Sequence, residues 1–74
     1  MILGFRANIN NDSHRIFLIR LVNYGVKFIG IPSQIERDHY SFVFDTDTDF
    51  RMAQTIRRSM VGQNYTDIPM QGTL

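Results

Sequence analysis

Apolar side chains recur at every second position near the start of the chain, at Leu3, Phe5, Ala7 and Ile9. This period of two is typical of a β-strand with one face buried. Because Arg6 and Asn8 occupy the alternate positions, the apolar set is expected to face the core. Turn residues and potential helix N-caps follow at positions 10–13.

A helical period replaces the alternation from about Asp12 to Tyr24. At about 100° per residue, one broad face is expected to be buried, and it consists of Phe17, Leu18, Leu21, Val22 and Tyr24. Ile16 and Ile19 then fall among polar residues, beside Arg15 and Arg20. Apolar residues on a polar helix face predict a partner-binding surface. Gly25 is expected to end the helix with a positive φ angle.

Two further strands are predicted over Val26–Ile31 and His39–Phe44. The first has apolar side chains on both faces. In the second, Tyr40, Phe42 and Phe44 alternate with Ser41 and Val43. The polar connection between the two strands is short, so they are expected to pair as a hairpin.

A second helix is predicted to follow Asp49 and to end near Gly62. Its apolar stripe consists of Met52, Ala53, Ile56 and Met60, as expected for a helix that packs on a sheet. The residues after it are short and mixed, and Tyr65–Met70 could add an edge strand. Pro69 would exclude that strand from the interior of a sheet.

The order of these elements predicts an α+β fold of the ferredoxin-like type, β-α-β-β-α with a final β-strand as an option. Two helices would cover one face of a mainly antiparallel sheet. The 74 residues form one expected domain, with an ordered core over about residues 2–62. Residues 63–74 would form a short edge strand or a flexible tail.

Composition narrows the range of functions only a little. The chain has no cysteine, a net charge of +1 and 43% hydrophobic residues. Disulfides and thiolate metal sites are thereby excluded. No apolar run approaches the roughly 20 residues that cross a bilayer, so a cytoplasmic protein without membrane contact is expected. Seven of the eight basic residues are arginine, which favours planar contacts at interfaces.

Three carboxylates alternate with threonines at the end of the third strand, at Asp45, Asp47 and Asp49. Such a run could bind a hard cation, but neither an EF-hand loop nor a phosphatase nucleophile motif is completed downstream. Threonine and aspartate also cap helix N-termini, and their charge suits the helix dipole. A helix cap is therefore the preferred interpretation, and the three aspartates remain weak metal candidates.

No set of residues with the spacing of a catalytic site is present. The two histidines lie on different predicted elements, and no glycine-rich phosphate loop occurs. We therefore expect a protein that is not an enzyme and needs no cofactor.

The segment Leu21–Ile31, LVNYGVKFIGI, followed by FVFDTDTD and a helix, resembles an ACT domain. The resemblance covers most of the chain and implies a ferredoxin-like regulatory module that senses a small molecule and pairs edge to edge. The family usually carries a glycine in the loop after the first strand, where this chain has residues 10–13, NNDS.

The residues Tyr40-Ser41-Phe42-Val43, together with Phe5, are similar to parts of an RNA recognition motif. That resemblance implies single-stranded nucleic-acid binding, with Phe5, Tyr40 and Phe42 stacking on bases from an open sheet face and Arg57 and Arg58 adding charge. If Phe5 pointed outward, however, Arg6 would be buried without a partner. The aromatic residues are therefore better interpreted as core.

With the aromatic residues in the core, the opposite face of the sheet would carry Arg6, Ile29, Ile31 and Val43. A face that is apolar and lacks aromatic rings predicts contacts with protein. We expect a non-catalytic regulator or inhibitor that binds a protein partner, with a homodimer as its form. Nucleic-acid binding and small-molecule sensing are the alternatives.

Overall fold

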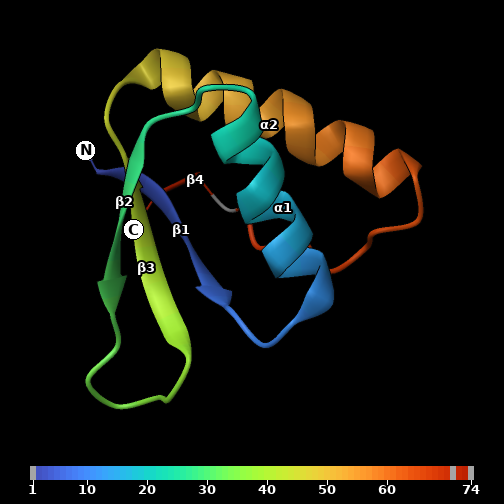
Figure 1. The fold of residues 1–74 in the computed structure, drawn as a ribbon. Helices are drawn as coiled ribbons and strands as arrows, with labels where there is room; N and C mark the ends of the chain where they lie inside the picture. The colour runs from blue at the N-terminus through green and yellow to red at the C-terminus, as the bar shows by residue number, and fades with distance from the viewer. Residues whose placement is uncertain (1, 71, 74) are drawn as a thin grey trace.

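The computed structural model describes residues 2–70 and 72–73 and has the element order β-α-β-β-α-β. The strands are β1 (Leu3–Asn8), β2 (Phe28–Pro32), β3 (His39–Phe44) and β4 (Gly72–Thr73), and the helices are α1 (Asp12–Asn23) and α2 (Asp47–Gly62). The predicted α+β class is confirmed. Both helices lie on the same side of the sheet (Figure 1).

The sheet has the strand order β2-β3-β1-β4, and each neighbouring pair is antiparallel. The predicted hairpin of β2 and β3 is confirmed, with Ile29 opposite Val43 and Ile31 opposite Ser41. On the other side of β3, Val43 pairs with Gly4. The side chains of neighbouring strands therefore form rows across the sheet, and each row lies on one face.

The core lies between the sheet and the helices. Phe5 and Ala7 of β1 and Phe42 and Phe44 of β3 are buried, as their alternation predicts. The rings of Phe5 and Phe42 stack with centroids 5.1 Å apart, and Phe17 of α1 meets Phe5 edge-on at 5.3 Å. Aromatic pairs at such separations add to the free energy gained by burial.

The buried face of α1 is narrower than the predicted one. Phe17 and Leu21 are fully buried, whereas Val22 and Tyr24 are 64% and 66% exposed. Phe17 and Leu21 are four residues apart and share one stripe, but Val22 is turned about 100° away from Leu21. The prediction that Val22 and Tyr24 are buried is therefore wrong. Gly25 follows with φ +78°, as expected of a residue that ends a helix.

The predicted edge strand over Tyr65–Met70 is also wrong. These residues have no regular secondary structure, and the two-residue strand β4 pairs with β1 further along the chain. Ile68 and Met70 are nevertheless buried in the core, on either side of Pro69. The core thus extends past the expected limit at residue 62.

Candidate protein-binding surface

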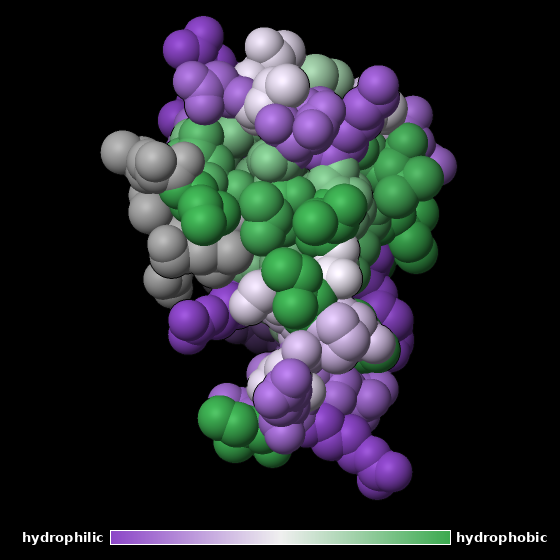
Figure 2. All heavy atoms as spheres, turned by 90° about the vertical axis from the view of Figure 1, so that its left-hand side faces the viewer, coloured by the Kyte–Doolittle hydropathy of each residue, from purple (hydrophilic) through white to green (hydrophobic). Residues whose placement is uncertain are grey.

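The face of the sheet turned away from the helices carries exposed apolar side chains. Ile2, Ile29 and Ile31 are 57%, 64% and 50% exposed, and Val43 is half-buried between Ile29 and Gly4. We call the surface formed by Ile2, Ile29, Ile31 and Val43 the open face. In Figure 2 apolar side chains gather in a band across the molecule, with polar side chains at both ends.

The open face is hollowed on both sides of Val43. One hollow has a volume of about 340 Å³. It is lined by two neighbouring segments, residues 27–29 and residues 43–45. A second, of about 210 Å³, is bounded by Ile2, Val43, Asp45 and Asp47 among others. Both hollows lie at the end of the sheet where β3 leads into α2.

Arg6 lies at the other end of this surface. It is exposed, and it pairs with Ser41, which in turn pairs with Ile31 of β2. The register places the four predicted residues Arg6, Ile29, Ile31 and Val43 together on one face. Ile2 was not among the predicted residues, although its spacing of two from Gly4 would have placed it there.

The predicted surface on α1 is only partly exposed. Ile19 is 58% exposed, but Ile16 is half-buried against the core. Arg15 forms an ion pair with Asp12 and donates to the carbonyl oxygen of Ile9 at 3.2 Å. Arg15 therefore fixes the start of α1, and Ile16 contributes less to a contact surface than the sequence suggests.

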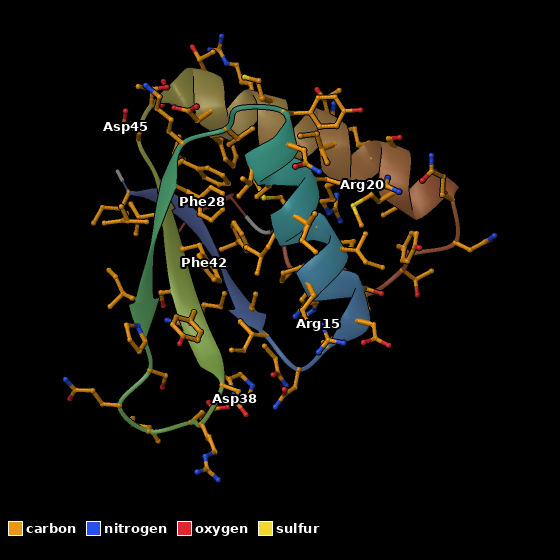
Figure 3. The ribbon with its side chains drawn as sticks, viewed as in Figure 1. Arg15, Arg20, Phe28, Asp38, Phe42 and Asp45 are labelled. Carbon is orange, nitrogen blue, oxygen red and sulfur yellow. The ribbon has the colours of Figure 1, made fainter. Side chains whose placement is uncertain are left out.

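A groove between α1 and α2 was missed by sequence reasoning. Its volume is about 380 Å³, and its lining includes Arg20 and Tyr24 of α1 and Met52 and Ile56 of α2. The arginine side chain points toward α2 (Figure 3), where its Nη1 atom donates to Oε1 of Gln63 at 3.0 Å. The exposed position of Tyr24 opens this groove, and the helical pattern alone had assigned Tyr24 to the core.

The aspartate run forms the N-terminal cap of α2. Thr46 is the N-cap residue, and its Oγ1 atom accepts the N–H of Asp49 at 3.2 Å. In return, the Asp49 carboxylate accepts the Thr46 N–H at 3.1 Å, which completes a capping box. Its other oxygen accepts the N–H of Lys27 at 3.0 Å. The predicted cap is confirmed.

These hydrogen bonds stabilise the ionised form of Asp49. The side-chain hydrogen bond from Thr46 is the largest cause, followed by the Lys27 N–H, and together they lower the pKa of Asp49 below its ordinary value of 3.8 although burial opposes the shift. Asp45 and Asp47 are exposed. Across residues 2–70 and 72–73, no three acidic or histidine side chains are placed to hold a metal ion.

The aromatic residues proposed for base stacking are on the helix side of the sheet. Phe5 and Phe42 are 1% and 8% exposed, and Tyr40 stacks on Phe42 at 5.7 Å. The preferred interpretation of Phe5 and Phe42 as core residues is therefore confirmed, and the exposed aromatic face that the RNA-recognition resemblance implied is wrong for these two rings. Of the two arginines in that alternative, Arg58 is exposed on α2 and Arg57 is half-buried. The Nε atom of Arg57 has no hydrogen-bond partner among the described residues.

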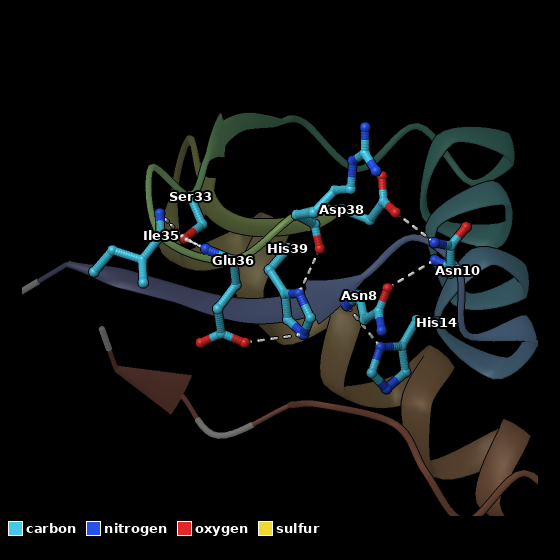
Figure 4. A network of polar contacts seen from close by, with 9 residues as sticks. Asn8, Asn10, His14, Ser33, Ile35, Glu36, Asp38 and His39 are labelled. Carbon is cyan, nitrogen blue, oxygen red and sulfur yellow. Dashed lines mark hydrogen bonds and ion pairs between the residues drawn. The ribbon is translucent and has the colours of Figure 1, made fainter.

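Backbone and side-chain hydrogen bonds hold the loop between β2 and β3 in place (Figure 4). The Ser33 hydroxyl accepts the N–H groups of Ile35 and Glu36, and the Asp38 carboxylate accepts from the Asn10 side chain. Asp38 has φ +64°. Ile35 is 93% exposed in this loop, outside the strand residues that form the open face. It provides a natural control position for surface substitutions.

None of the helices in the part of the chain that the structure describes is long and apolar enough to cross a membrane. Comparison with protein-family models finds no match, and comparisons with curated proteins and with solved structures find none either.

Proposed function

We propose that this protein is a non-catalytic protein-binding domain that acts as a regulator or inhibitor through the open face of its sheet. The observation that carries the proposal is the continuous apolar surface of Ile2, Ile29, Ile31 and Val43. Scattered exposed apolar residues are common on monomers, but a contiguous patch rimmed by polar residues is typical of a binding site.

The architecture supports this proposal. The chain connects β1 through α1 to β2, and β3 lies between these two strands. This connection resembles the split β-α-β unit of ferredoxin-like folds. Because both helices pack on one side, such a sheet keeps its other side free for a partner. We therefore assign the chain to the ferredoxin-like type as part of the proposal.

The energetics favour a protein as the occupant. Complete burial of an isoleucine side chain contributes roughly 1.5–3 kcal/mol relative to full exposure. Ile2, Ile29 and Ile31 are each at least half exposed. Covering them would therefore contribute a few kcal/mol of favourable free energy, which offsets part of the cost of association. Among the described residues, the open face presents no buried polar side chain that would position a small molecule, and Phe5, Phe42 and Phe44 of the sheet point to the core instead.

The helix layer offers a second surface. The groove beside Arg20 and Tyr24 lies on the opposite side of the molecule from the open face. A protein bound to the open face would leave this groove accessible. This separation suits a regulator that contacts two protein surfaces at the same time.

The test is a comparison of matched variants in binding to proteins of the native host. Ile29→Asp places a charge in the centre of the open face, and Ile35→Asp places the same charge on a more exposed isoleucine away from it. We expect proteins retained by the tagged wild type and by Ile35→Asp to be lost with Ile29→Asp, while circular dichroism shows all three folded. Retention by Ile29→Asp would contradict the proposal.

A further inference from the structure

The open face is asymmetric along its strands. At one end the hollows beside Val43 are bounded by Asp45 and Asp47, and the strand register places Ile2 in the same row as Asp45. At the other end Ile31 and Arg6 stand on either side of Ser41. One end is therefore concave and acidic, except for Lys27, and the other carries projecting side chains that include an arginine.

The strand register defines what would meet if two open faces were packed together. Consider a two-fold axis that lies between the sheets and crosses the strands at Val43. Each strand then runs antiparallel over its own copy, so that Val43 meets Val43 and Ile29 meets Ile29. The row with Ile31 and Arg6 in one copy lies over the row with Lys27, Asp45 and Ile2 in the other.

In this arrangement the projecting side chains of one copy lie over the hollows of the other, and the basic end of one copy lies over the acidic end of the other. Ile31 would enter the hollow bounded by Lys27 and Ile29, and Arg6 would enter the one bounded by Ile2 and Asp45. An arginine can pack its aliphatic stem on an isoleucine while its guanidinium binds a carboxylate. The same contacts occur twice, as an isologous interface requires.

A two-fold axis parallel to the strands gives a poorer match. With that axis the acidic ends of the two copies lie over one another, and Arg6 remains a sheet length away from both carboxylates. An interface of standard size buries roughly 800 Å² per partner, about a sixth of the 5068 Å² surface of this chain (800/5068). One sheet face can supply such an area.

We propose that the open face binds the open face of a second copy of this chain, in the antiparallel arrangement, with Arg6 of each copy paired with Asp45 of the other. This inference rests on the proposed function, because it names the occupant of the same surface. The helix grooves then face outward on both sides of the homodimer.

Charge reversal tests the pairing directly. Arg6→Glu and Asp45→Arg each place like charges together, which is strongly unfavourable in an interface, so each is expected to raise the dissociation constant of the dimer at least about tenfold in analytical ultracentrifugation. The double variant Arg6→Glu/Asp45→Arg restores the opposite charges and is expected to return to within about threefold of the wild type. Arg37→Glu, a reversal in the loop between β2 and β3, is the control and should leave the dimer unchanged.

Cross-linking tests the direction of the strands. The chain has no cysteine, so a mixture of the variants Lys27→Cys and Ile31→Cys should be joined by a short bis-maleimide cross-linker, because these positions lie over each other only in the antiparallel arrangement. Sheets that pack face to face are roughly 10 Å apart, too far for a direct disulfide. Each variant alone should cross-link poorly.

The two proposals fail in different ways. A wild type that stays monomeric at millimolar concentration overturns the homodimer, as does a double variant no better than the single ones. If Ile29→Asp still abolishes partner binding in that case, the open face remains a protein-binding site with another occupant. If dimers form but Ile29→Asp leaves them intact, the dimer interface is elsewhere and the homodimer proposal is overturned, while the retention of host proteins by Ile29→Asp still decides the proposed function.

Discussion

The carboxylate of Asp49 accepts a hydrogen bond from the backbone N–H of Lys27, 22 residues earlier in the chain, with a distance of 3.0 Å between Oδ1 and N. The other oxygen of the same carboxylate accepts from the N–H and hydroxyl groups of Thr46. Asp49 thus joins the segment before β2 to the first turn of α2. A residue that resembled a metal ligand in the sequence is instead a structural link between two elements.

This link makes folding stability depend on pH. The folded-state pKa of Asp49 is below its unfolded value of about 3.8, so its contribution is fully present above about pH 5 and is lost as the pH falls through the folded-state pKa. We expect Asp49→Asn to be less stable than the wild type at pH 7. The difference should shrink steadily toward pH 2, as measured by urea denaturation across this range.

Asp47→Asn provides the control for this measurement. Asp47 lies in the same first turn and is exposed, so it shares the helix-dipole interaction but not the hydrogen bonds of Asp49. Its effect on stability at pH 7 should be smaller. Equal losses of stability for the two variants at pH 7 would contradict the role assigned to Asp49.

Gly30 is covered by an aromatic ring. A Cβ atom at this position would lie 2.8 Å from Cε1 of Phe42, whose ring is stacked between Phe5 and Tyr40 and has little freedom to move. We expect Gly30→Ala to lower the free energy of unfolding by about 1–3 kcal/mol. Gly62→Ala, where no atom of the described residues lies within 4 Å of the added Cβ atom, should instead raise it by about 0.4–1 kcal/mol. Thermal unfolding of both variants at one protein concentration measures the two changes in stability. If both variants changed in stability by the same amount, the ring of Phe42 would not restrict position 30.

Local patterns predicted those features that depend on neighbouring residues. The alternation in β3 assigned Phe42 and Phe44 to the core, and the run of aspartate and threonine at positions 45–49 was interpreted as the cap of the second helix. Both signals need only a few consecutive residues, because the period of a strand and the geometry of a helix cap are local properties.

Features set by distant parts of the chain were not predictable in this way. Whether Val22 and Tyr24 are covered depends on where α2 crosses α1, which no pattern within α1 specifies. Ile68 and Met70 are buried without belonging to a regular element, so neither helical nor strand periodicity marks them. The open face was predictable from alternation, but its hollows and the opposite charges at its ends required the strand register.

His14 links the end of β1 to the first turn of α1. The backbone N–H of Asn8 donates to its Nδ1 atom at 3.0 Å, and the side chain of Asn11 accepts the N–H of His14 at 3.2 Å. Leucine at position 14 would leave the Asn8 N–H without its partner, which costs about 1–3 kcal/mol. Asparagine at the same position can place Oδ1 near the site of Nδ1 and should recover part of that loss. Hydrogen exchange of the Asn8 amide gives a local readout: it should be faster in His14→Leu, and an unchanged rate would rule out this hydrogen bond as a stabilising contact.

The buried position of Phe42 separates protein binding from the nucleic-acid alternative. A stacking residue on an exposed face can be removed with little effect on stability, whereas removal of a buried phenylalanine typically costs about 3–5 kcal/mol. Because Phe42 contacts the rings of Phe5, Phe28 and Tyr40, we expect Phe42→Ala to destabilise the protein by an amount in this range.

RNA binding itself is measured by fluorescence anisotropy with labelled oligouridine, at low and at physiological salt concentration. With its aromatic residues under the helices, the wild type should show no saturable binding at physiological salt, since charge contacts alone weaken steeply as salt rises. Tyr40→Ala is the decisive variant, because Tyr40 is only half-buried at the end of the aromatic row. If it abolished a measurable RNA affinity while unfolding stayed unchanged, the stacking interpretation would be favoured over the open face as the binding surface.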